Sequence, residues 1–116
     1  MKESSPQLAG LSFSSLAELF DAAQPQTNGE KALVAGYWIQ IVQGAEELTA
    51  HAIHSELKNL GHAVSNITLA LDQLKKRKPA LVHQIRKSGK AQQARKTYKI
   101  TKEGVKAVEA MLRRET

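Results

Sequence analysis

The spacing of apolar residues changes abruptly at Pro79, and this change limits the fold class. Before Pro79, apolar side chains recur every three or four residues over 30–43, 49–60 and 66–77, which is the period of helices that bury one face. After Pro79, two short stretches are extended in character, and a helical period then returns near the end of the chain. One pair of strand candidates excludes a parallel α/β sheet, so the sequence predicts a mainly α fold with a small β-hairpin.

Helix ends are predicted from residues that cap a helix or break it. The first of the three helices should end at Gly44 and the second at Gly61. Pro79 should terminate the third, because proline cannot continue a helix. The predicted N-terminal caps are Thr49 for the second helix, Ser65 or Asn66 for the third, and Thr101 for the helix after the hairpin.

Trp38, the only tryptophan, is expected in the core rather than as a platform for a ligand. It belongs to a broad apolar stripe in the first helix. Gly36 weakens that helix locally and allows a neighbouring element to approach closely. The rest of the stripe is Leu33, Val34, Tyr37, Ile41 and Val42.

Residues 1–29 are predicted to form an N-terminal extension to a domain over 30–115. Within the extension, a short helix over about 14–23, capped by Ser14 or Ser15, should stop before the next proline. A linker rich in Gln, Asn and Pro follows it.

The short N-terminal helix has an apolar face that is too small to stand alone. Leu16, Leu19 and Phe20 must therefore cover something, either the domain or a second copy of the chain. One hypothesis is that the chain forms a homodimer through this short helix and the last helix.

Charge is divided unevenly between the two halves of the chain. Residues 1–60 contain three Lys and seven Asp or Glu, whereas residues 61–116 contain fourteen Lys or Arg and four acids. Between Lys75 and Lys99 there are ten basic residues and no acidic one. A merely solvated surface usually mixes both signs, so the asymmetry indicates a polyanionic partner such as nucleic acid.

Three segments carry a family resemblance: Leu48–Ile53, Asn66–Leu74 and Tyr98–Gly104. In this order of elements they resemble the winged helix-turn-helix superfamily, similar to small bacterial regulators of the MarR, PadR and ArsR kind. The last segment has the apolar-Thr-x-x-Gly pattern with which many such domains leave the wing. The resemblance covers about residues 30–115. It implies that the third helix enters the major groove and that the wing touches the adjacent backbone.

The third helix, over 66–77, therefore carries the first group of candidate contacts. If its apolar residues face the core, the helical period places its polar residues on or near the opposite side. Amides there suit adenine, and hydroxyls suit phosphates or base edges. The candidate contacts are Ser65, Asn66, Thr68, Gln73, Lys75 and Lys76.

Asp72 interrupts this helix with a negative charge, which repels the DNA backbone. It could accept a hydrogen bond from cytosine, or pair within the helix with Lys75 or Lys76. The intrahelical pair is favoured, because such pairs at this spacing are common.

The segment 86–96 is the predicted wing and carries the second group of candidate contacts. Its basic side chains suit phosphates, and arginine is favoured in a narrow minor groove. The alternative interpretation is a basic hairpin that only discourages strand-to-strand aggregation. The candidate contacts are Arg86, Lys87, Lys90, Gln92, Gln93, Arg95 and Lys96.

No catalytic, metal or cofactor site is predicted. His51 and His54 lack an evident third ligand, and Ser88–Lys90 lacks the strand, glycine spacing and helix of a phosphate-binding loop. The few acids of the second half are scattered, and the chain contains no cysteine. No signal peptide or membrane span is apparent, so we expect a cytoplasmic protein that is not an enzyme.

The sequence thus predicts a DNA-binding module that acts as a transcriptional regulator on double-stranded DNA. The alternative is a protein-interaction adaptor that uses the winged-helix surface to bind an acidic protein. RNA recognition is less favoured, because the basic region offers only Tyr98 for base stacking.

Overall fold

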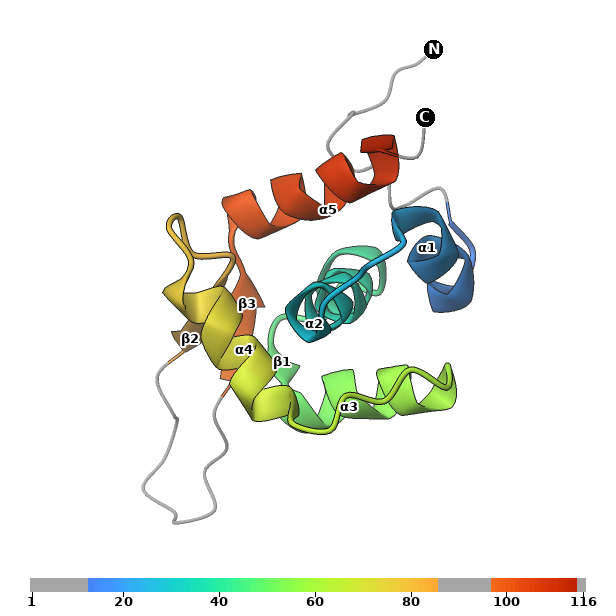
Figure 1. Ribbon diagram of the computed structural model, residues 1–116. Coiled ribbons are helices and arrows are strands. Elements are labelled where there is room, and N and C mark those ends of the chain that lie inside the picture. The colour runs from blue at the N-terminus through green and yellow to red at the C-terminus, as the bar shows by residue number, and fades with distance from the viewer. Residues whose placement is uncertain (1–12, 86–96, 115–116) are drawn as a thin grey trace.

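The computed structural model describes residues 13–85 and 97–114. In chain order its elements are α1 (Leu16–Ala23), α2 (Asn28–Tyr37), the π-helical turn η2 (Trp38–Val42), β1 (Leu48–Thr49), α3 (Ala50–Asn59), α4 (Ile67–Lys76), β2 (Val82–Ile85), β3 (Thr97–Ile100) and α5 (Lys102–Arg114). The described part is thus mainly helical with a small antiparallel sheet. Helix α2 lies at the centre and contacts α1, α3, α4 and α5, which surround it (Figure 1).

The predicted caps are confirmed. The Oγ1 atom of Thr49 accepts a hydrogen bond from the Ala52 N–H at 3.0 Å, and Ser15 caps α1 in the same way. Asn66, rather than Ser65, caps α4. Thr101 accepts from the Gly104 N–H at 2.9 Å and also donates to the Ala80 carbonyl oxygen at 2.8 Å. Each cap satisfies a backbone donor that the first helical turn leaves free.

Glu18 makes a second set of hydrogen bonds at the start of α1. Its carboxylate accepts hydrogen bonds from the backbone N–H and the hydroxyl of Ser14, both at 3.0 Å. Because these bonds favour the charged form, they lower the pKa of Glu18 below its ordinary value.

The sheet differs from the predicted hairpin by one strand. Leu48–Thr49, expected to open the second helix, forms β1 instead, and the strand order is β1-β3-β2. Leu48 pairs with Tyr98, so the central strand β3 has an antiparallel neighbour on each side. A two-residue strand shows no alternation of its own, and it forms only because β3 offers an edge.

The first long helix also differs from its prediction, because it does not remain α-helical to Gln43. It widens into a π turn at Trp38, where the Gln43 N–H donates to the Trp38 carbonyl oxygen at 2.9 Å. Gln40 lies in this turn, and its Oε1 atom accepts from the Ile100 N–H at 2.9 Å. Strand β1 is too short to pair with Ile100. The Gln40 side chain therefore supplies the acceptor that a longer β1 would have offered to the Ile100 N–H.

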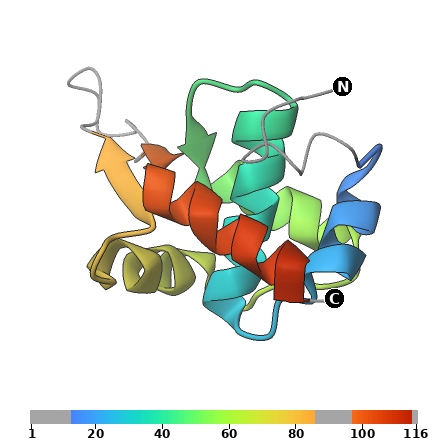
Figure 2. The same cartoon turned by 90° about the horizontal axis from the view of Figure 1, so that it is seen from above.

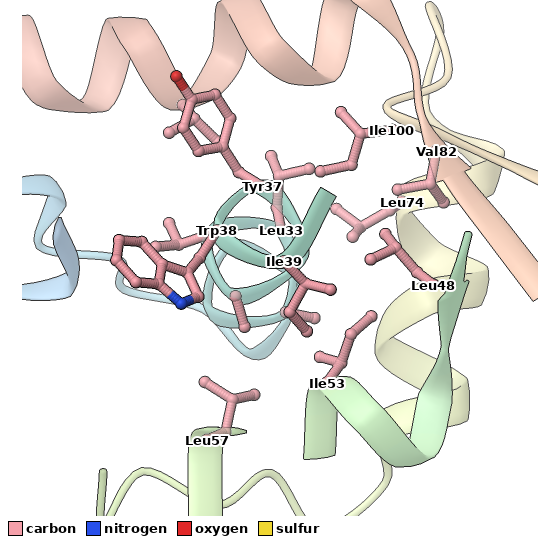
Figure 3. Close-up of a cluster of buried hydrophobic side chains, with 14 of the residues drawn as sticks. Leu33, Tyr37, Trp38, Ile39, Leu48, Ile53, Leu57, Leu74, Val82 and Ile100 are labelled. Atoms are coloured by element: carbon pink, nitrogen blue, oxygen red, sulfur yellow. The ribbon is translucent and has the colours of Figure 1, made fainter. Parts of the chain in front are cut away.

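The core forms around α2 and η2 (Figure 3). Side chains from α3, α4 and the sheet point toward this central helix, and Trp38 is buried as expected. Gly36 allows the close approach predicted for it, since a Cβ there would lie 3.1 Å from Leu48 Cδ1. The hydroxyl of Tyr37 donates to the buried carboxylate of Glu109 at 3.2 Å, which joins α2 to α5.

Helix α1 packs on the same chain. Leu16, Leu19 and Phe20 are buried in the common core, and α1 contacts α2 and α5. Seen from above, α5 crosses the molecule and its C-terminal end lies beside α1 (Figure 2). The apolar residues that motivated a homodimer are thus covered within one chain, and a homodimer stays a prediction, as does a domain boundary at residue 29.

Replacing Asn66 with alanine is expected to lower the free energy of unfolding by about 1 kcal/mol, because the Leu69 N–H would lose its side-chain acceptor. Urea denaturation of the wild type and the variant measures the difference. Asn66→Ser should recover most of the loss, since serine also caps helices. Equal stability of Asn66→Ala and the wild type would contradict the role of this cap.

Candidate nucleic-acid interface

Helix α4 has one buried face and one exposed face. Ala70, Leu71 and Leu74 are buried against the core, chiefly against α2. Because the helix turns about 100° per residue, the residues opposite them face solvent. Helix α4 lies at the rim of the molecule, with β2 beside it (Figure 1). The exposed residues at and after its start are Ser65, Asn66, Thr68, Leu69, Gln73 and Lys76.

Asn66 is exposed, but the fold already uses one of its amide atoms. Its Oδ1 atom accepts the capping hydrogen bond from the Leu69 N–H at 3.0 Å. A bidentate contact with adenine needs both the oxygen and the nitrogen of an amide. Asn66 is therefore a weaker candidate for adenine recognition than the sequence suggested.

Gln73 keeps its amide available. Its side chain is exposed one helical turn after Leu69, and it forms no hydrogen bond with another described residue. Lys76, one turn further, is exposed and forms no salt bridge within the described residues. These two side chains are the polar groups of α4 that are best placed to contact an outside ligand.

Lys75 is held by neighbours instead. Its Nζ atom donates to Gln84 Oε1 in β2 at 2.7 Å and lies 3.6 Å from Asp72 Oδ1. The predicted intrahelical pair of Asp72 is thus confirmed for Lys75. The pair compensates the one acidic charge on α4 and ties the helix to the hairpin strand.

Exposed basic residues also lie directly after α4 and on the outer face of the sheet. Arg77 and Lys78 follow the helix and are exposed. In the sheet, His83 pairs across the strands with Lys99, and both are exposed. Cross-strand partners share one face of a sheet, so these two side chains lie together on the face opposite the buried Val82 and Ile100. The sequence analysis did not single out these four residues, although each of the cations belongs to the basic run after Lys75.

Tyr98 does not offer a stacking surface. It is 1% exposed, and its burial, together with the nearby negative charge of Asp72, raises its pKa above the ordinary value. No other large aromatic side chain among the described residues is exposed. Since single-stranded nucleic acids are held largely by stacking on aromatic rings, this surface is poorly suited to them.

Leu69 is the residue on this face that the sequence analysis missed as a candidate. It is 52% exposed and is the one large apolar side chain that the described residues leave exposed. The helical period could have found it, because position 69 lies opposite the apolar stripe formed by 67, 70, 71 and 74.

The predicted wing contacts Arg86, Lys87, Lys90, Gln92, Gln93, Arg95 and Lys96 lie outside the described residues. These seven residues carry five positive charges and two amides, and their contact with DNA stays a prediction. They connect β2 to β3, which are paired antiparallel.

Within residues 13–85 and 97–114, no three His, Cys, Asp or Glu side chains gather as metal ligands. No helix in these ranges is both long and apolar enough to cross a membrane. His51 and His54 both lie on α3, where His51 is exposed and His54 is partly buried.

Comparisons with known proteins identify no family for the chain. No protein-family model, curated protein or solved structure matches it.

Proposed function

We propose that this protein is a winged helix-turn-helix protein that binds double-stranded DNA, with α4 in the major groove and the basic segment 86–96 on the adjacent backbone or minor groove. In this role it is a binding protein that regulates transcription rather than an enzyme. The observation that carries the proposal is the exposed face of α4, where Gln73 and Lys76 are free of partners among the described residues. An α-helix with such a face fits the width of the major groove.

The order of elements supports the winged-helix part of the proposal. A short strand precedes α3, α3 and α4 follow each other, and two antiparallel strands precede α5. The strand order β1-β3-β2 places the hairpin of β2 and β3 next to α4, and the Lys75–Gln84 hydrogen bond joins them. The order of elements and the place of the hairpin strands beside α4 are those expected of a winged helix.

The charge of this region supports a polyanionic partner, and the lack of exposed large aromatic rings in the described part of the chain favours a duplex among nucleic acids. Exposed basic residues continue from α4 into Arg77 and Lys78, and the single acid of α4 is paired. Phosphate contacts by such residues give affinity that falls with salt. The absence of an exposed large aromatic ring in the described residues favours a duplex over single strands.

The test is fluorescence anisotropy of a labelled duplex, titrated with protein over a range of salt concentrations. Lys76→Ala should reduce the slope of log K against log salt by about one, because one phosphate contact is lost. Lys75→Ala is a less direct test, since it also leaves the Asp72 carboxylate without its cation and removes the hydrogen bond to Gln84.

The matched control is Lys106→Ala, which removes the same charge from an exposed position on α5. Its salt slope should equal that of the wild type. If the wild type does not bind duplex DNA even at low salt, the proposal is wrong. The protein-adaptor alternative would then be tested by pull-down with acidic proteins.

A further inference from the structure

Leu69 occupies the middle of the exposed face of α4. Asp72 lies three residues after it and Gln73 four residues after it, so both are neighbours of Leu69 on the helix surface, and Asp72 is paired with Lys75. Lys76 lies close to the line from Leu69 to Gln73, seven residues after Leu69. An exposed leucine is thus surrounded by groups that donate or accept hydrogen bonds.

The fold uses the backbone of Leu69 and leaves much of its side chain uncovered. Its N–H donates to the capping oxygen of Asn66, which any residue other than proline could do. Its side chain is 52% exposed, whereas Ala70, Leu71 and Leu74 supply the buried face of α4. The buried face of α4 is therefore complete without Leu69, and about half of this leucine remains open to a partner.

Duplex DNA, the partner that we propose for α4, offers one kind of apolar group in its major groove. In the major groove each base pair presents hydrogen-bonding atoms, and thymine alone of the four ordinary bases adds a C5-methyl group. A leucine side chain cannot form hydrogen bonds with the donors and acceptors of the base edges. If it lay against them, it would exclude the water that otherwise bonds to them. Opposite a methyl group it instead buries apolar surface on both sides.

We propose that Leu69 is a specificity-determining residue that contacts the C5-methyl group of a thymine, an inference that rests on the duplex-DNA function proposed above. Gln73, four residues later on the same face, then lies over a neighbouring base pair, where its free amide can pair with adenine. Lys76 holds the adjacent phosphate and contributes no preference between bases. The exposed face of α4 thus recognises a thymine through an apolar contact and contacts the neighbouring base and phosphate through polar side chains.

The experiment first selects preferred duplexes from a random library with the wild-type protein. Each thymine of the selected site is then replaced, one at a time, by deoxyuridine, which removes only the methyl group. The wild type should lose about fourfold in affinity at one thymine per bound helix, the value expected for one buried methyl group. Leu69→Ala should bind the thymine and deoxyuridine duplexes with nearly equal affinity at that position.

Three controls show whether the result is specific to the Leu69 side chain. Lys76→Ala should bind more weakly but keep the fourfold preference, because its contact is to phosphate. The thermal unfolding of Leu69→Ala should match that of the wild type, since the truncated side chain is half exposed. The salt slope of Leu69→Ala should also be unchanged.

The outcomes separate the inference from the function beneath it. Selected sites that the wild type binds equally well with thymine or deoxyuridine at every position would overturn the role of Leu69 and leave duplex binding in place. A Leu69→Ala variant that keeps the preference would do the same. Failure of the wild type to bind any duplex, at any salt concentration, would overturn both.

Discussion

Simultaneous replacement of Lys90, Arg95 and Lys96 by alanine should weaken duplex binding by on the order of a hundredfold at about 0.1 M salt. Each of these cations is proposed to neutralise one phosphate and to release its counterion. The slope of log K against log salt should therefore fall by about three. Anisotropy titrations of one labelled duplex at several salt concentrations give both quantities.

The matched control for this triple variant removes three lysines elsewhere. Lys31, Lys58 and Lys106 lie on α2, α3 and α5, outside the proposed interface, and their replacement lowers the net charge by the same amount. This control should lose far less affinity than the first variant. Similar losses in both would mean that net charge alone attracts the DNA, which would contradict a role for the segment 86–96.

The second large effect is expected at Gly104, in the first turn of α5. A Cβ added there would overlap the carbonyl oxygen of Leu81 and lie 2.7 Å from Ile100 Cγ2. The Leu81 oxygen is backbone and also accepts a hydrogen bond from the Thr101 N–H at 3.1 Å, so it cannot move aside without loss. Gly104→Ala should lower the free energy of unfolding by about 1–3 kcal/mol, the range found for overpacked sites.

Gly29→Ala is the matched control, because Gly29 is also buried in the first turn of a helix. There a Cβ would make an ordinary contact with Leu74 Cδ2 at 3.4 Å. Since alanine favours helices over glycine, this variant should be as stable as the wild type or more stable by up to about 1 kcal/mol. Urea denaturation of both variants measures the difference. Equal stabilities would show that α5 can shift away from Leu81.

Gly104 belongs to a short motif at the start of α5. The sequence analysis identified Thr101 and Gly104 through a family resemblance, as the pattern that follows the wing. The structure supplies a physical reason for each. Thr101 caps α5 and also bonds to the Ala80 carbonyl oxygen, and Gly104 lets the backbone of Leu81 pass against α5.

Local chemistry made most helix boundaries predictable. A cap acts within three residues of itself, so Ser15, Thr49, Asn66 and Thr101 could be recognised or narrowed to a pair without knowledge of the fold. The face of α4 that would be buried was equally accessible, because its apolar residues repeat with the helical period. The intrahelical pair of Asp72 depends on the same period.

Strand β1 and the π turn could not be predicted in this way. Leu48–Thr49 becomes a strand because β3, almost fifty residues later in the chain, presents an unpaired edge. The π turn places Gln40 where its side chain accepts from the Ile100 N–H, a partner 60 residues away. In both cases the hydrogen-bonding partner is distant in the chain, so the residues near β1 and the π turn carry no sign of it.

By itself, then, the sequence determined the order of helices and extended segments, the caps, and the uneven charge that indicates a polyanionic partner. Only the tertiary structure decided which side chains on α4 remain available. It engages Asn66 Oδ1 and Lys75, leaves Gln73 and Lys76 without partners among the described residues, and exposes Leu69 at the centre of the face. The physical reason is that periodicity and caps act over a few residues, whereas burial and side-chain pairing depend on elements brought together from distant parts of the chain.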